Sequence, residues 1–333
     1  MTNIPDVQMA EGSASEILKY RRGNYDVTNT VCVSDPKAVS EEVCRLFQLN
    51  FPSAPMEKIE QAFIDFESIY TGNYPGYYAA ETPYHDIQHC LDVTLCMTRL
   101  MIGYNRYEED NVLDAALAEL GIIVSLFHDV GFIRQHGDEA TPNGAVYIPT
   151  HVSRGGNFLA KYLPTLGLGH QTELAGKLLH FTGYEMAVSS IQSESPQQKL
   201  LGYMIASSDL LAQMADRCYL EKCSNRLYEE FIFAQMACPE VGGKNPEDFQ
   251  YASRDDMMKK TTGFMQSVID VRLQETLGGV HNHIKSFFGG LHLYMDAMEK
   301  NKRYLEEKMM QDGWQGNLRR KAIWTLVTDQ FTP

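Results

Sequence analysis

The sequence lacks the short motifs that name most chemistries. It has no glycine-rich phosphate loop of the P-loop or dinucleotide type, no G-x-S-x-G elbow and no H-E-x-x-H zinc motif. Basic residues are also outnumbered: 29 Lys and Arg stand against 43 Asp and Glu, a formal net charge of −14. Because an acidic surface repels polyanions, this balance argues against a nucleic-acid polymer as partner.

Disulfide and membrane signals are absent as well. The seven cysteines are odd in number and irregularly spaced, which favours reduced thiols in a cytoplasmic protein. The N-terminus lacks a basic region followed by an apolar one, and no apolar run approaches the ~20 residues of a membrane span. We therefore expect a cytoplasmic protein that does not contact a membrane.

What the chain does have is helical periodicity, which begins near Lys37, with no alternating strand pattern longer than a few residues. This predicts an all-α fold, a compact helical bundle. We expect residues 1–36 to form a loose N-terminal arm, residues 37–311 the main domain, and residues 312–333 a tail suited to packing or to a homodimer contact. The expected helices are Glu41–Asn50, Met56–Thr71, Tyr84–Ile102, Asn111–Val130, Val152–Tyr162, Thr172–Phe181, Gln197–Asp216, Leu220–Ala237, Asp255–Leu277 and His283–Gln311.

Imidazoles and carboxylates recur at inward positions of these helices. Only His and Asp are involved, a ligand set that suits two hard or borderline divalent metals held close together, with Asp129 as a bridge. Taken singly, each is more often a satisfied core residue, but the joint pattern is hard to explain without metal. The candidates are His85, His89, His128, Asp129, His151, His180 and Asp209.

Two parts of this pattern are more specific than the rest. His85 and His89 stand four apart on an expected helix, so one can be a ligand and the other a proton donor, and Asp92 on the same face is either an orienting carboxylate or a solvated charge. His128 and Asp129 end the apolar run 122–127, where polar side chains are costly unless something binds them.

These motifs resemble a known superfamily. The order H…HD…D is similar to that of the HD-domain metallophosphohydrolases. The segment Tyr84-His85-Asp86-Ile87-Gln88-His89, followed by Asp92-Val93, resembles the Y-H-N-x-x-H-x-x-D-V signature of class I cyclic-nucleotide phosphodiesterases. Ser208-Asp209-Leu210 resembles their C-A-D-L segment, residues 226–231 their R-x-x-E-E-F helix, and residues 261–265 their S-Q-x-G-F-I segment. The resemblance covers roughly residues 55–310, in order.

The resemblance implies a role for each matching residue. His89, His128, Asp129 and Asp209 would bind the first metal, and Asp129 would also bridge to the second. His85 would be the general acid that protonates the leaving oxygen. Phe264 would clamp a purine ring, and Thr261 stands where the purine-selecting Gln of the family should be.

The departures from the family matter equally. Asp86 replaces its Asn, Phe132 stands where its H-D-x-x-H has the second His, and Gly183 stands where an Asp is expected. His151 and His180 are extra ligand candidates, a feature of the HD-GYP and di-iron HD branches. If both bind the second metal, iron, manganese or another transition metal is favoured there over magnesium.

The sequence thus predicts a metal-dependent phosphodiesterase with two divalent ions, drawn from Fe, Mn, Zn or Mg. Its expected substrate is a small, cyclic nucleotide, hydrolysed by attack of a metal-bridging hydroxide. Two alternatives stay open at this point: an HD-type mixed-valent di-iron oxygenase acting on a small polar substrate, and a regulatory binding module with a vestigial site.

Overall fold

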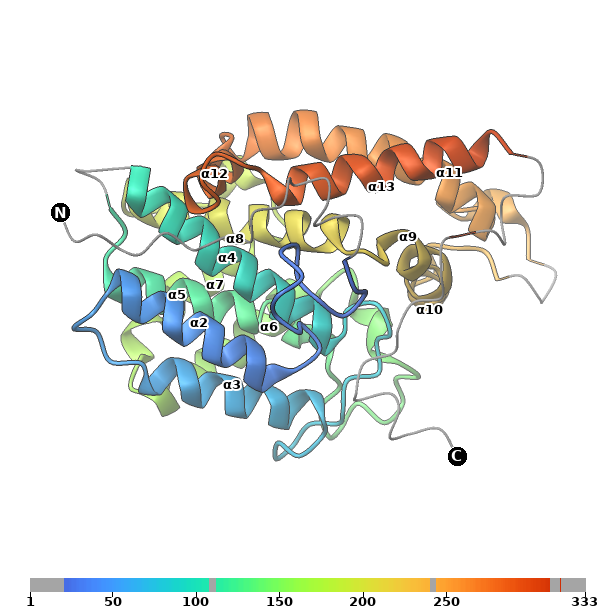
Figure 1. Cartoon of the computed structure of the whole chain (residues 1–333). Coiled ribbons are helices and arrows are strands. Elements are labelled where there is room, and N and C mark those ends of the chain that lie inside the picture. Colours follow the sequence, from blue (N-terminus) through green and yellow to red (C-terminus); the bar gives the residue numbers. More distant parts are fainter. Residues whose placement is uncertain (1–20, 108–111, 240–243, 312–317, 319–333) are drawn as a thin grey trace.

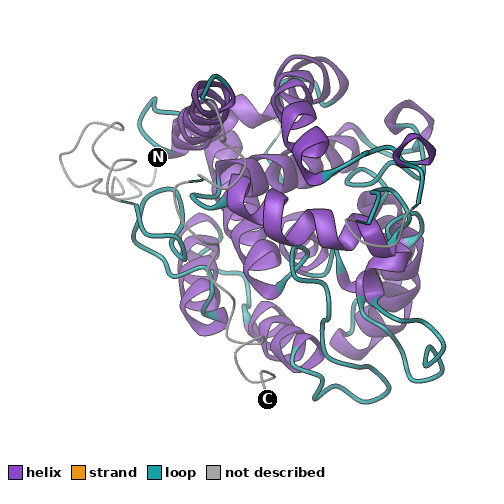
Figure 2. Cartoon of the chain, turned by 90° about the vertical axis from the view of Figure 1, so that its right-hand side faces the viewer, coloured by secondary structure: helices purple, strands orange, loops and turns teal. Residues whose placement is uncertain are grey.

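A computed structural model describes residues 21–107, 112–239, 244–311 and 318. Within these residues the chain forms helices joined by turns and loops, with no named strand (Figure 2). This confirms the all-α prediction. The α-helices are α2 (Pro36–Asn50), α3 (Glu57–Tyr70), α4 (Ile87–Tyr107), α5 (Ala115–Leu126), α6 (His151–Tyr162), α7 (Thr172–Leu179), α8 (Pro196–Ala215), α9 (Tyr219–Lys222), α10 (Tyr228–Phe233), α11 (Arg254–Ser267), α12 (Ile284–Phe287) and α13 (Leu293–Met309).

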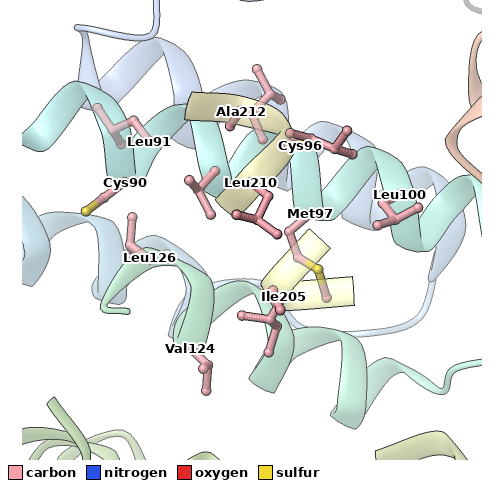
Figure 3. Close-up of a cluster of buried hydrophobic side chains, with 14 of the residues drawn as sticks. Cys90, Leu91, Cys96, Met97, Leu100, Val124, Leu126, Ile205, Leu210 and Ala212 are labelled. Atoms are coloured by element: carbon pink, nitrogen blue, oxygen red, sulfur yellow. The ribbon is translucent and has the colours of Figure 1, made fainter. Parts of the chain in front are cut away.

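Helix α4 forms the centre of the molecule and crosses the middle of Figure 1. It is buried without interruption from Ile87 to Tyr104. It packs against α2, α5, α8 and α12, so a helix lies on every side of it. In Figure 3, Leu91 and Met97 of α4 lie among side chains of α5 and α8, such as Leu126 and Ile205. A helix buried all round has no solvated face for a polar residue.

The helix starts follow from capping residues in the sequence. The Asp35 side chain accepts backbone N–H bonds at the start of α2, where Pro36 is the first helical residue. Asp114, Ser195 and Ser253 cap α5, α8 and α11 in the same way. Asp86 accepts from the backbone N–H of His89 at 3.0 Å and so occupies the capping position before α4.

Four helix predictions need correction. The expected helix His283–Gln311 is two helices, α12 and α13, because Gly289 and Gly290 take positive φ angles of 61° and 98° between them. The expected helix Tyr84–Ile102 starts later, at Ile87. His85 therefore lies just before α4, and only His89 of the expected pair lies on the helix. The expected helices 220–237 and 255–277 contain π-helical segments, Cys223–Leu227 and Val268–Thr276.

One stretch of the described chain, Ala115–Phe132, is long and apolar enough to cross a membrane, and 83% of it is buried inside the protein. It comprises α5 and the short 3-10 helix Val130–Phe132. The sequence therefore does contain one apolar run near membrane-spanning length. Burial of this extent is what the core helix of a bundle requires, and the stretch carries no weight as a membrane signal.

The described part of the expected N-terminal arm packs on α4. Val27, Val31 and Val33 belong to the hydrophobic core. Asp26 is fully buried, pairs with Arg99 at 2.8 Å and accepts the backbone N–H groups of Thr30 and Val31. Residues 1–20 and most of the expected tail, 312–317 and 319–333, lie outside the described residues, and the domain limits remain predictions.

We predict that Asp26→Asn lowers the free energy of unfolding by about 3 kcal/mol or more, because it leaves the Arg99 charge buried without its counter-ion. Urea denaturation measures this. Glu41→Gln is the control, since it breaks the exposed Lys37–Glu41 pair and should cost less than about 0.5 kcal/mol. Equal costs for the two variants would show that Asp26 does not anchor the segment.

Candidate metal centre

Three segments bring four of the predicted ligands together. His89 lies in the first turn of α4, His128 and Asp129 follow the end of α5, and Asp209 lies within α8. Because α4 packs on both α5 and α8, these positions meet beside the N-terminal end of α4. His89, His128 and Asp129 are buried, and the Asp209 side chain is 14% exposed.

The donor atoms of these four residues converge on one point. The Nε2 atoms of His89 and His128 are 3.2 Å apart. Asp129 Oδ2 lies 3.3 Å from His89 Nε2 and 3.2 Å from His128 Nε2. Asp209 Oδ1 lies 3.3 Å from His89 Nε2 and 3.8 Å from His128 Nε2. Donor atoms of His89, His128 and Asp209 fall within 4.8 Å of one another, as a metal ion requires.

The carboxylates of this cluster stabilise positive charge at its centre, as the pKa shifts of its residues show. Burial alone would lower the pKa of His89, but its contacts with Asp129 and Asp209 raise it to about 10. Burial likewise opposes the charged form of His128, and Asp129 raises its pKa above the usual value. Burial favours a protonated Asp129, yet the imidazoles of His128 and His89 hold its pKa well below the usual range.

The residues fit a metal on two further observations. The Oδ2 atom of Asp129 is buried and has no hydrogen-bond partner. His128 Nδ1 is 2.8 Å from the Ser125 carbonyl, to which it donates, so Nε2 bears the lone pair. A backbone carbonyl in that role is the usual way to orient a metal-binding imidazole. Two imidazole lone pairs and two carboxylates facing one point would hold a divalent cation.

His151 stands at the edge of the same cluster. Its Nδ1 atom donates to the Ile148 carbonyl at 2.8 Å, and its Nε2 atom lies 3.9 Å from Asp129 Oδ1. Burial lowers its pKa, so the imidazole is neutral at physiological pH. His151 therefore directs the lone pair of its Nε2 atom to the Asp129 side of the cluster, next to the Oδ1 oxygen.

The predicted proton donor, His85, is held by a glutamate. Its Nδ1 atom lies 2.5 Å from Oε2 of Glu230, a fully buried residue of α10. The other oxygen of Glu230 accepts the backbone N–H groups of Tyr84 and His85. Burial lowers the pKa of His85, but the charge and hydrogen bond of Glu230 outweigh it, and the net shift is upward. Glu230 thus favours the protonated imidazole, in which Nε2 also carries a proton.

Phe132 explains why the missing second His of the H-D-x-x-H pattern leaves no gap. Its ring lies between the imidazoles of His85 and His151, with ring centroids 4.3 Å away on both sides and interplanar angles of 16° and 17°. The ring fixes the planes of both imidazoles. A protonated His85 is also stabilised by an aromatic face.

The remaining predicted residues lie less clearly in the centre. His180 follows the last residue of α7, and its Nδ1 atom is buried without a hydrogen-bond partner. Among the described residues, the clusters that could hold a metal ion do not include His180. Asp92 is buried, and burial raises its pKa to about 7. Its Oδ1 atom also lacks a partner, so it is not the solvated helix charge that was the alternative.

The two predicted substrate contacts lie on α11. Thr261 is buried, and its hydroxyl bonds to the Met257 carbonyl at 2.9 Å within its own helix. Phe264 is 43% exposed, and so can meet a ligand from solvent. No contact between either residue and the four converging ligands is described, so both assignments stay predictions.

Sequence reasoning gave no role to two residues of the site. Glu230 lies in the R-x-x-E-E-F segment, where it and its neighbour Glu229 stand between Tyr228 and Phe231. Cys90 has its Sγ atom within 4.8 Å of donor atoms of His128 and Asp129. Burial raises the pKa of this thiol well above its usual range, and the Tyr70 hydroxyl contacts it at 3.1 Å.

Comparison with known proteins gives one likeness to describe. No family model matches the sequence, and no curated protein matches it. Among solved structures, the chain is similar to the phosphodiesterase domain of Salpingoeca rosetta rhodopsin phosphodiesterase. The identity is 13%, the TM-score is 0.48, and the match covers 90% of this chain and 95% of that one. This likeness carries no conclusion about the activity of the chain.

Gly131 keeps His151 beside Asp129. A Cβ atom there would overlap the His151 carbonyl oxygen and crowd the Gly155 nitrogen at 2.8 Å, so α6 can approach only a glycine. Gly131 has no positive φ angle. In the sequence this glycine follows shortly after His128-Asp129. It is required because the 3-10 helix Val130–Phe132 packs closely on α6, and not because the chain turns there.

We predict that Gly131→Ala pushes α6 outward and lowers the free energy of unfolding by about 2 kcal/mol. Gly156→Ala on the same helix is the matched control, since the nearest atom to its Cβ is 3.9 Å away. Helix propensity makes that change neutral or stabilising by up to about 1 kcal/mol. Urea denaturation compares them, and a Gly131→Ala variant as stable as Gly156→Ala would contradict the packing role.

Proposed function

We propose that this chain is a metal-dependent phosphodiesterase that hydrolyses a small, cyclic nucleotide. One observation carries the proposal: a four-residue metal-ligand cluster lies beside a partly buried imidazole, that of His85, which Glu230 holds and which is not itself part of the cluster. Hydrolysis of a phosphodiester needs both parts, since charge must be neutralised on the phosphate and a proton must reach the leaving oxygen.

The ligand set assigns the ions to particular residues. His89, His128, Asp129 and Asp209 would hold one, and Asp129, His151 and the predicted ligand His180 would hold the other. When bound, two such ions activate water and neutralise the non-bridging phosphate oxygens. The imidazole-rich set favours iron, manganese or zinc over magnesium.

The protein's own contribution is to place one proton. Glu230 takes the Nδ1 proton of His85 in a hydrogen bond, which leaves the Nε2 proton for a substrate oxygen. Phe132 holds the imidazole plane from the side, so the Nε2 atom keeps one direction. The carboxylate of Glu230 is itself fixed by two backbone N–H groups, and cannot turn away from His85.

The metal assignment predicts the ion content of variants. Asp129→Asn should lose both bound metal and activity, because it removes the shared carboxylate. His151→Ala and His180→Ala should each lower the metal content by one ion per chain. Elemental analysis of the purified proteins measures this. A fully loaded, active Asp129→Asn enzyme would disprove the bridging role.

The acid assignment predicts the opposite pattern. His85→Ala should keep its metal and lose roughly 100-fold or more in kcat on a panel of cyclic mono- and dinucleotides. Glu230→Gln should lose roughly 10- to 100-fold. Glu229→Gln is the control, because this neighbour is 46% exposed and pairs with Arg254 instead.

Two outcomes would count against the assignments. Loss of metal from His85→Ala would make His85 a ligand rather than a proton donor. If no nucleotide of the panel is hydrolysed by the metal-loaded protein, while a non-phosphorylated substrate turns over only in air, the chain is an oxygenase and the proposal fails.

A further inference from the structure

A second cavity lies far from the metal centre. Its volume is about 390 Å³, and it is enclosed by the π-helical segment Val268–Thr276, the turn before α12, α12 itself and the start of α13. Helix α12 packs on α4, and a Cβ at Gly103 near the C-terminal end of α4 would meet His283 next to α12. At 1.5 Å per residue, Gly103 is about 20 Å along α4 from His89. The lining residues are Ile269, Asp270, Gln274, His281, Asn282, Lys285, His292 and Met295.

Two buried histidines line this cavity, and each has a nitrogen without a hydrogen-bond partner. His281 is 4% exposed and His292 is 8% exposed, and their ring centroids are 5.6 Å apart. The nitrogens without partners are His281 Nδ1 and His292 Nε2. The Leu273 carbonyl lies close enough to His281 to raise its pKa, and the His281 carbonyl does the same for His292. Neither carbonyl oxygen meets an unpartnered nitrogen in hydrogen-bond geometry.

The other nitrogen of each ring fixes the tautomer. His292 Nδ1 accepts the backbone N–H of Met295 at 3.3 Å, as the cap of α13, so its proton is on Nε2. His281 Nε2 lies 3.3 Å from the amide nitrogen of Asn282, a donor, so its proton is on Nδ1. Burial lowers the pKa of His281 to about 4 and that of His292 to about 3, so both rings are neutral. Both unpartnered nitrogens are therefore N–H donors that lack an acceptor.

A single cation lies beside these donors. Lys285 of α12 is exposed and close enough to disfavour the charged form of both imidazoles. No ion pair joins it to a carboxylate in the described parts of the chain. Asp270, the acidic residue of the lining, instead accepts from Gln266 at 2.6 Å. The lining thus carries one ammonium and one carboxylate, and the imidazole N–H groups add donors that no acceptor meets.

We propose that this cavity binds a small molecule through an anionic group, a phosphate or a carboxylate. The group accepts from the Lys285 ammonium and supplies the acceptor that the N–H groups of His281 and His292 lack. A divalent metal is the wrong occupant, since the N–H tautomers present no lone pairs to it and Lys285 repels it. The cavity volume lies within the range of small-molecule sites, and Ile269 and Met295 offer apolar contact to the rest of the ligand.

Isothermal titration with inorganic phosphate, and separately with acetate, tests this on the full chain. The expected Kd for such small probes is on the order of 1 mM, and the tighter probe identifies the anionic group. Lys285→Met should weaken binding about tenfold or more. His292→Asn should do the same while leaving the thermal midpoint nearly unchanged, because asparagine still caps α13 but lacks the ring N–H. Lys161→Met, an equal charge change on the exposed side of α6, is the control.

The outcomes separate this cavity from the metal centre. Phosphate that binds at the metal centre is lost in His89→Ala and retained in Lys285→Met. If neither probe binds, if the Lys285→Met and His292→Asn variants bind as the unchanged protein does, or if Zn²⁺ binds here and the anions do not, the proposal is wrong. Activity of the metal centre does not enter the measurement, so failure of the proposed hydrolysis leaves this result unaffected.

Discussion

The burial of α4 on all sides is the constraint on which the rest of the structure depends. A helix that reaches no solvent along its length must pair each polar side chain with another element, or leave it at a cost of several kcal/mol. Arg99 pairs with Asp26 of the N-terminal segment, Asp86 pairs with Arg226 at 2.8 Å, and His89 meets Asp129 and Asp209. Each pairing ties a separate part of the chain to the central helix.

At the metal centre such pairing is incomplete. Asp129 Oδ2 has no hydrogen-bond partner, and the imidazole nitrogens of His89 and His128 face each other at 3.2 Å. Stability alone would not bring two imidazole nitrogens and two carboxylates to face one point. Around this point the chain is rigid: Glu230 receives three hydrogen bonds, Phe132 is stacked on both faces, and Gly131 permits the contact with α6. Cation binding is the function that such an arrangement supports.

Much of the fold was predictable because helical periodicity and caps are local signals. The bounds of α3 and α8 differ from the predicted helices by a residue at either end. The errors occur where the backbone conformation, rather than the hydrophobic pattern, decides where a helix begins or ends. Gly289 and Gly290 divide the last predicted helix, and the apolar pattern continues across them. The start of α4 depends on the Asp86 cap, whereas periodicity alone carried the helix back to Tyr84.

The sequence by itself determined which residues of the site could bind metal, since imidazoles and carboxylates at inward helix positions are costly without a use. Among the seven candidates, the resemblance of the motifs to those of the phosphodiesterases set His89, His128, Asp129 and Asp209 apart before any geometry was known. Only the tertiary structure decided that Glu230, some 145 residues away, holds His85, and that Phe132 separates His85 from His151. It also assigned the ring proton of His128 and of His151, because the tautomer depends on which backbone carbonyl lies against the ring. These pairings join residues distant in the chain, and no local pattern encodes them.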